Sequence, residues 1–343
     1  MTHWDNLCPT MDSIYCFLIQ VKGNLFSKPA FSLARDVKLP AFFSGLTRKF
    51  ACIPPYKGVK ILVKLAVITD SACDLAQDEL AARGVITVPL TVSFGNDVYR
   101  DGVDLTRKEF YQLLVSSKEQ ARTAQPSPGA FESAYDQALT AAERVLVISL
   151  SSGLSGTYES ALIAKEQSPE QSRITIFDSK AASIGQGLMV IGAAERAAAG
   201  QDMETVWGFL EHIRGRLASV FTLDTLEYLV RGGRLSRVQG FVGTMLNIKP
   251  LLQLDADGKI VPLEKVRGRK QAVERLLEIM AEAGHELAGQ RVGICHARAV
   301  GEAEELAGRI RGRFKVAEIV IGEISAAIGS HTGPGCLSVF FQR

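Results

Sequence analysis

Apolar runs rich in β-branched residues alternate with longer, more polar stretches along most of the chain. The first such run, Lys60–Thr69, predicts a strand, and Asp74–Arg83 behind it predicts a helix. The alternation continues to about residue 199, with further strands predicted at Val85–Phe94, Val145–Leu150 and Ile174–Phe177, and helices at Lys108–Ser116, Ala130–Glu143 and Ala181–Ala199. Strands that alternate with helices of this length predict a parallel sheet with helices on both faces.

The pattern changes from about residue 219. Two short apolar runs, Leu251–Leu254 and Lys259–Pro262, flank Asp255-Ala-Asp-Gly258, which is typical of a β-hairpin. Strands are also predicted at Val220–Leu223, Val292–His296, Ala317–Ile321 and Cys336–Phe341, with helices at Gln271–Ala283 and Glu302–Arg311. We therefore predict two domains, a parallel-sheet α/β domain of residues 60–218 and a mixed α/β domain of residues 219–343.

The overall charge is balanced, but the first 58 residues differ in composition from the rest. The chain has 39 Lys and Arg against 37 Asp and Glu, which argues against a disordered polyampholyte or a general nucleic-acid-binding protein. Residues 1–58 are basic and rich in aromatic residues, proline and cysteine. We expect a poorly ordered extension there, and one hypothesis is a misassigned start, with the natural start near Val59 or Val63.

No segment has the composition of a membrane span or a metal centre. The longest charge-free run, Ile324–Gln342, contains glycines, a proline and a histidine, and the apolar Ser13–Ile19 lacks the basic flank of a signal peptide. The six cysteines form no CxxC pair and no cluster with histidine. The sequence thus predicts a cytoplasmic, reduced protein with no metal and no integral membrane association.

A serine-rich segment follows the predicted strand Val145–Leu150 and precedes a helix. Hydroxyls and unpaired backbone N–H groups at such a helix start favour an anion, whereas the simpler interpretation is a serine-rich helix cap. The segment Ser149–Tyr158 holds four serines, including Ser151, Ser152 and Ser155. It lacks the spacing of a nucleophile elbow and the lysine of a Walker A loop, and no dinucleotide fingerprint follows the first strand.

Two further segments hold candidate polar side chains. His331 lies among three glycines and two hydroxyl residues on a predicted loop, where it could donate a hydrogen bond to an anion or act as a general base. Arg231 and Arg234 flank a Gly-Gly pair, where arginine can clamp a carboxylate or simply stabilise a helix C-terminus. A competing hypothesis is a serine-dependent hydrolase or phosphotransferase that uses Ser155 or Ser152 with His331 and Asp178.

Several motifs taken together resemble those of the DegV family. The resemblance covers about residues 62–341, leaves residues 1–58 without a counterpart, and departs from the family pattern at Ala124, where serine is common. The motifs are Ala66–Asp74, Thr123–Ser127, Leu150–Tyr158, Asp178–Lys180, Tyr228–Ser236, Lys249-Pro250, Lys265–Arg267 and His331–Gly335.

The resemblance implies a fatty-acid-binding protein with two α/β domains. The acyl chain would lie in an apolar tunnel of the second domain, and the carboxylate would meet hydroxyls at the domain junction. The implied carboxylate ligands are Thr123, Ser151, Ser152 and Ser155, with Ser155 and Ser152 favoured among the serines, and the polar network behind them is Arg234 and His331.

The same resemblance implies a partner. Arg267 would engage the separate ATP-dependent subunit of a fatty acid kinase, which phosphorylates the bound carboxylate. The chain itself would then have no catalytic residues and no cofactor, and its contact with membranes would be transient. A third, non-lipid alternative is a sensor of another carboxylate.

Overall fold

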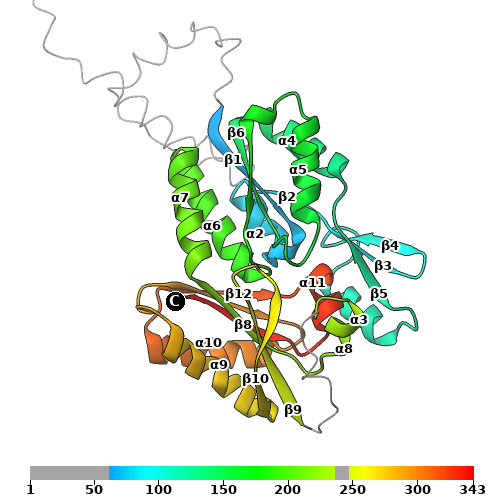
Figure 1. Ribbon diagram of the computed structural model, residues 1–343, viewed down its shortest axis with the longest axis vertical. Helices are drawn as coiled ribbons and strands as arrows, with labels where there is room; N and C mark the ends of the chain where they lie inside the picture. The colour runs from blue at the N-terminus through cyan, green and yellow to red at the C-terminus, as the bar shows by residue number, and fades with distance from the viewer. Residues whose placement is uncertain (1–61, 236–246) are drawn as a thin grey trace, which may run out of the picture. The chain divides into compact units, whose positions relative to one another are not determined.

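A parallel sheet lies at the centre of the first half of the chain. In the computed structural model, which describes residues 62–235 and 247–343, strand β1 (Val63–Asp70) pairs with β2 (Ile86–Val88) and β6 (Ala142–Ser149). The fourth strand, β7 (Ile174–Asp178), pairs in parallel with β6, giving the order β2-β1-β6-β7. Figure 1 labels β1, β2 and β6 of this sheet. The predicted parallel sheet is confirmed. The predicted extension of residues 1–58 lies outside the described residues.

Helices cover both faces of this sheet, as the alternating pattern predicted. One face packs against α4 (Pro128–Leu139) and α5 (Thr157–Gln167), and the other against α6 (Ile184–Ala198), with α7 (Met203–Arg216) outside it. Helix α4 ends four residues earlier than predicted, because Ala142 and Glu143 already belong to β6. The remaining short helices here are η3 (Ser71–Cys73), α2 (Gln77–Ala82) and η4 (Gln171–Arg173).

The predicted strand Val85–Phe94 is wrong as a single element. Pro89, which cannot donate a ladder hydrogen bond, separates β2 from β3 (Thr91–Phe94), and the two strands belong to different sheets. Strand β3 lies between β4 (Asp97–Arg100) and β5 (Ala121–Ala124) in an antiparallel sheet, and neither β4 nor β5 is among the strands predicted from the sequence. Between them, α3 (Arg107–Ser116) begins with a capping box formed by Thr106 and Glu109.

The second half of the chain forms a six-stranded mixed sheet. Its order is β10-β9-β8-β13-β11-β12, and only β11 and β12 pair in parallel. The predicted hairpin is present as β9 and β10, which extends to Arg267. The bounds are β8 (Leu217–Thr222), β9 (Ile248–Leu254), β10 (Ile260–Arg267), β11 (Arg291–His296), β12 (Glu318–Glu323) and β13 (Leu337–Gln342).

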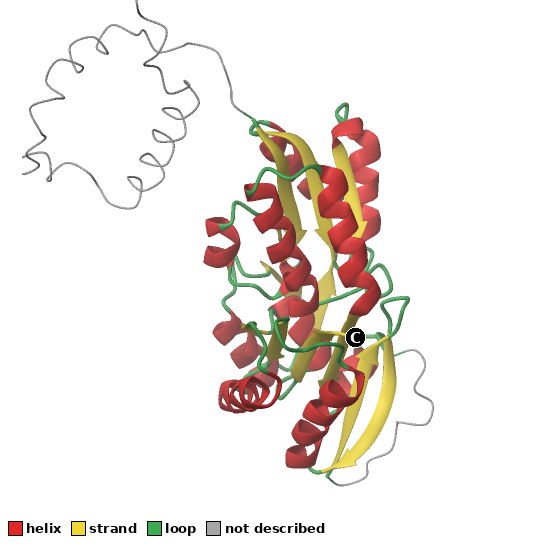
Figure 2. Cartoon of the chain, turned by 90° about the vertical axis from the view of Figure 1, so that its left-hand side faces the viewer, coloured by secondary structure: helices red, strands yellow, loops and turns green. Residues whose placement is uncertain are grey.

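Helix α6 is the element that joins the two sheets. It packs against β1 and β6 of the parallel sheet and also against β11 and β12 of the mixed sheet, while α9 (Arg269–Ala283) and α10 (Val300–Phe314) cover the far face of the mixed sheet. All eleven residues from Ile184 to Ala194 are buried. Figure 2 shows the helices packed alongside the strands. Within the described part of the chain, no helix is long and apolar enough to cross a membrane.

Candidate functional site

A mostly apolar cavity lies between elements of both halves. The space within its outline, which includes open solvent, is about 790 Å³. Leu90, Leu150 and Leu154 line it from the first half, and Phe221, Leu254 and Ile260 line it from the mixed sheet. Its polar lining residues include four candidates from the sequence, Thr123, Ser155, Arg234 and His331. The other polar side chains in the lining are Ser183, Ser219, Thr332 and Ser338.

His331 contacts Thr123 at this polar group. The His331 Nε2 and Thr123 Oγ1 atoms are 2.8 Å apart, which is hydrogen-bonding distance across 208 residues of sequence. Burial, and next the neighbouring Arg234 cation, lower the pKa of His331 to about 4. The imidazole is therefore neutral at pH 7. Its other nitrogen, Nδ1, is buried without a hydrogen-bond partner among the described residues.

The prediction that His331 lies on a loop is wrong. It lies in the last turn of a short helix, α11 (Ala326–Thr332), and the glycines near it serve close packing. A Cβ placed on Gly232, just after α8 (Glu227–Arg231), would overlap His331 Nδ1, and a Cβ on Gly333 would overlap the Tyr228 ring. The Gly-Gly and His-Thr-Gly segments thus face each other. Glycine at position 232 leaves room for the imidazole.

Ser155 and Arg234 complete the polar group. The Ser155 and Thr157 hydroxyl oxygens are 2.9 Å apart at the start of α5. The Arg234 guanidinium donates to the carbonyl oxygens of Gly232 and Leu154, at 2.6 and 3.2 Å, so that, among the described residues, backbone contacts hold it beside the cavity. The cavity therefore has an arginine, a neutral histidine and two hydroxyls at one place on an apolar lining.

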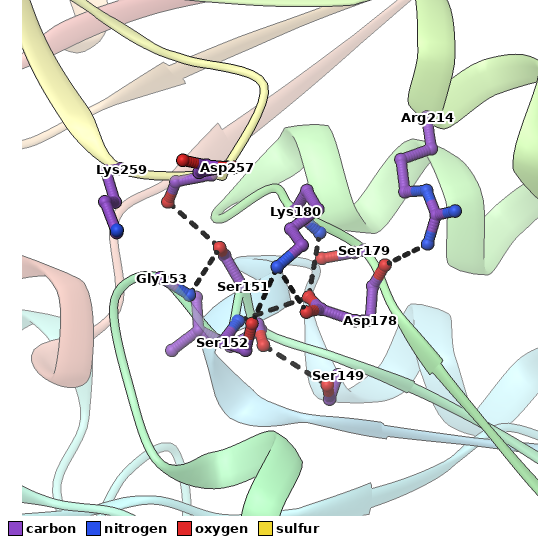
Figure 3. A network of polar contacts seen from close by, with 12 residues as sticks. Ser149, Ser151, Ser152, Gly153, Asp178, Ser179, Lys180, Arg214, Asp257 and Lys259 are labelled. Atoms are coloured by element: carbon purple, nitrogen blue, oxygen red, sulfur yellow. Dashed lines mark hydrogen bonds and ion pairs between the residues drawn. The ribbon is translucent and has the colours of Figure 1, made fainter.

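Ser151 and Ser152 do not line the cavity. The buried Ser151 hydroxyl donates to the Gly258 carbonyl at 2.9 Å and so joins the serine loop to the β9–β10 hairpin turn. The exposed Ser152 hydroxyl accepts a hydrogen bond of 2.8 Å from the Lys180 ammonium group (Figure 3). Of the three serines predicted as carboxylate ligands, the structure places only Ser155 at the cavity.

Asp178 belongs to this second network. Its carboxylate accepts from the Ser152 backbone N–H at 3.1 Å and pairs with the Lys180 ammonium at 2.9 Å. Burial alone would raise the pKa of Asp178, but the hydrogen bonds from Ser152 and Lys180 outweigh burial and hold the pKa below its usual value. Within residues 62–235 and 247–343, neither Ser155 nor Ser152 is hydrogen-bonded to His331. The arrangement required by the hydrolase hypothesis is not formed.

Arg267, the predicted partner contact, lies apart from the cavity lining. It is exposed at the end of β10, directly before Gly268 and α9. Sequence reasoning did not identify Gly232, although its place between Arg231 and Arg234 was a signal that the backbone approaches another group closely. Among the described residues, no group of three or more His, Cys, Asp or Glu side chains could hold a metal ion.

The fold and the site together define an α/β protein that encloses an apolar cavity with a cationic, hydroxyl-rich polar group. The family model described as "uncharacterised protein, DegV family" matches residues 64–343, and the chain belongs to this family. A DegV domain-containing protein of Caldanaerobacter subterraneus is 34% identical over 280 residues, which cover 82% of this chain and 99% of that protein.

Solved structures of similar proteins agree with this assignment. A fatty-acid-binding DegV family protein of Thermus thermophilus is 35% identical with a TM-score of 0.76, and the match covers 82% of this chain and all of that chain. The fatty acid kinase B3 protein of Streptococcus pneumoniae, loaded with linoleic acid, is 25% identical with a TM-score of 0.72, covering 81% of this chain and 99% of that chain.

Proposed function

We propose that this protein binds a long-chain fatty acid, with its carboxylate at Thr123, Ser155, Arg234 and His331 and its acyl chain along the apolar lining. The observation that carries the proposal is that these four side chains line the same, mostly apolar cavity. Burying about 14 methylenes at about 0.8 kcal/mol each gives roughly 11 kcal/mol before ordering costs. The tail therefore supplies most of the affinity, and the polar group sets the orientation.

The neutral imidazole favours one hydrogen-bond arrangement. If His331 Nε2 carries the proton, it donates to Thr123 Oγ1, and the threonine hydroxyl hydrogen is then available to a carboxylate. In the other tautomer, an Nδ1–H donor would be buried without a partner, which is the costlier state. We therefore assign the Nε2–H tautomer, with Thr123 as the direct carboxylate donor and His331 behind it. Arg234 adds the positive charge.

Fatty-acid binding is tested by native mass spectrometry of the purified protein. We expect a bound species of about 250–300 Da, as for a long-chain fatty acid. The methyl ester of the same fatty acid should bind the protein more weakly than the free acid does. Thr123→Val keeps the side-chain shape and should lower the affinity for the acid about tenfold, the effect of one lost hydrogen bond to a charged group. Ser152→Ala, at a hydroxyl outside the cavity, is the matched control and should leave the affinity unchanged.

Two results would contradict the binding proposal. The first is a protein that carries no lipid and does not bind added fatty acid. The second is hydrolysis of fatty acyl esters that is abolished by Ser155→Ala, which would establish the serine hydrolase instead.

We further propose that the loaded protein presents its ligand to the ATP-dependent subunit of a fatty acid kinase through the surface around Arg267. The support is the similarity to the Streptococcus pneumoniae fatty acid kinase B3 protein and the exposure of Arg267. Arg267→Glu should slow phosphorylation of the bound fatty acid by such a subunit at least about tenfold, because a reversed charge in an interface costs more than 1.4 kcal/mol.

Arg311→Glu makes the same charge change on exposed α10 and serves as the control for the kinase assay. It should leave phosphorylation unchanged, and both variants should bind fatty acid as the parent protein does. An Arg267→Glu protein that loses lipid, or a control that is equally slow, would refute the role of this surface.

A further inference from the structure

The short helix that carries His331 is capped by aspartates from distant parts of the chain. Its own N-cap residue, Ser325, makes no side-chain capping bond. Instead, Asp74 Oδ1 accepts from the Ser325 backbone N–H at 2.9 Å, and the two Asp101 oxygens accept from the Ala326 and Ala327 N–H groups at 3.0 and 3.3 Å. The free N–H groups at the start of α11 are thus paired with carboxylates of the first half of the chain.

Asp101 is itself held in place. The side chain is 2% exposed, and the Ser71 hydroxyl donates to Asp101 Oδ2 at 2.8 Å. The same Ser71 oxygen accepts from the Leu90 backbone N–H at 3.0 Å. Burial raises the pKa of Asp101 to about 6, so the group is mostly ionised at pH 7, when it best stabilises the positive end of a helix. The carboxylate is therefore a fixed, charged contact for α11.

Helix α11 connects its capped N-terminus with the cavity lining. It has seven residues, and Ala327, Ile328, His331 and Thr332 all line the cavity. Phe110 and Tyr111 pack so closely on Gly329 that a Cβ there would lie 2.7 Å from the Phe110 ring, which leaves the helix little freedom on that side. Because two turns of helix move as one body, a shift at Ala326 would change the place of His331 relative to Thr123.

From this geometry we propose that Asp101, with Asp74 beside it, is a positioning residue for the polar end of the cavity. Asp101 does not line the cavity. It fixes the N-terminus of α11 and thereby holds the imidazole of His331 at hydrogen-bonding distance from Thr123. The proposal rests on the proposed function where it concerns the carboxylate of a fatty acid, but the place of His331 can be measured without any ligand.

The test compares binding of palmitic acid and of its methyl ester to Asp101→Asn and Asp101→Ala. The ester keeps the tail and loses the charge, so the ratio of the two affinities reports the polar end alone. We expect Asp101→Ala to lower the affinity for the acid about tenfold and to leave that for the ester unchanged, with a smaller loss in Asp101→Asn, which keeps one acceptor oxygen. In a His331→Gln background, Asp101→Asn should have no further effect on the acid.

Asp202→Ala is the matched control, because Asp202 caps α7 by accepting from the Thr205 N–H at 2.9 Å and touches no part of α11. It should lower stability without changing the acid-to-ester ratio. The pKa of His331, followed by NMR without ligand, is the second readout. It should rise from about 4 toward its usual value of about 6.5 in Asp101→Asn, as a displaced ring gains water.

An unchanged ratio together with an unchanged pKa of His331 would overturn the positioning role and leave Asp101 with a purely stabilising one. If Asp101→Ala does not fold, Asp101→Asn supplies both readouts. A parent protein that binds neither acid nor ester would refute the proposed function, and the NMR titration would still decide the positioning role.

Discussion

Gly232→Ala is expected to lower the affinity for a long-chain fatty acid about a hundredfold. Gly232 has φ −75° and ψ −7°, so alanine meets no backbone strain there, and the effect comes from the new methyl group alone. That methyl group would overlap His331 Nδ1 and lie 3.1 Å from the Tyr228 carbonyl oxygen. The imidazole cannot keep its present position, so its hydrogen bond with Thr123 is disturbed, and Arg234, which donates to the Gly232 carbonyl, is disturbed with it. Two charge-assisted contacts of about 1.5 kcal/mol each are then lost.

The affinity loss is measured by calorimetric titration with palmitic acid, beside Gly208→Ala as the control. Gly208 lies in α7, and a Cβ placed on it would meet nothing within 4 Å. Its alanine variant should therefore bind as the parent does. Equal affinities in all three proteins would show that His331 and Arg234 do not hold the ligand.

The second large effect concerns acid stability. The unfolded chain protonates His331 near pH 6.5 and the folded protein only near pH 4, so the folded state binds fewer protons between these values. The stabilising contribution is complete above about pH 6.5 and is lost as the pH falls to about 4, a change of about 3 kcal/mol. The His331→Gln variant has no imidazole at this position and so lacks this pH-dependent contribution to the free energy of unfolding. The parent should therefore lose about 3 kcal/mol of unfolding free energy relative to His331→Gln over that range.

Urea unfolding of both proteins from pH 4 to pH 7 measures this difference. Asp70 and Asp101 act in the opposite direction, because burial raises the pKa of each to about 6, and their contribution to stability falls as the pH rises from about 4 to 6. Both proteins share these carboxylates, so their contribution cancels in the comparison. Parallel stability curves would mean that the imidazole titrates normally in the folded protein.

The sequence predicted the elements whose signals are local. The β-branched run Lys60–Thr69 predicts the strand that the structure contains as β1, and the predicted helix Lys108–Ser116 matches α3 to within one residue. The run Val85–Phe94 has no change of pattern where the chain passes from one sheet to another at Pro89. The glycines around His331 predict a loop, whereas the structure has α11 there, with its N-terminus capped by Asp101 and Asp74 from 225 and 251 residues away. Such pairings leave no trace in the local sequence.

The site was predicted in its residue types more fully than in its contacts. Thr123, Ser155, Arg234 and His331 gather at the cavity as the motifs suggested. The sequence alone does not distinguish neighbouring serines, however. The packing of the β9–β10 hairpin turn decides that the Ser151 hydroxyl binds the Gly258 carbonyl rather than lining the cavity.

Helix α6 limits how a ligand can enter. Its residues Ile184–Ala194 are buried between the parallel sheet and the mixed sheet, so they belong to both cores at once. Separating the two halves by a hinge movement would expose this apolar helix to water, at a free-energy cost of about 25 cal/mol for each Å² of apolar surface exposed. Exchange of ligand with the halves kept together is far less costly. The proposed ligand would therefore enter and leave through local movement of the segments around the cavity rather than through separation of the two halves.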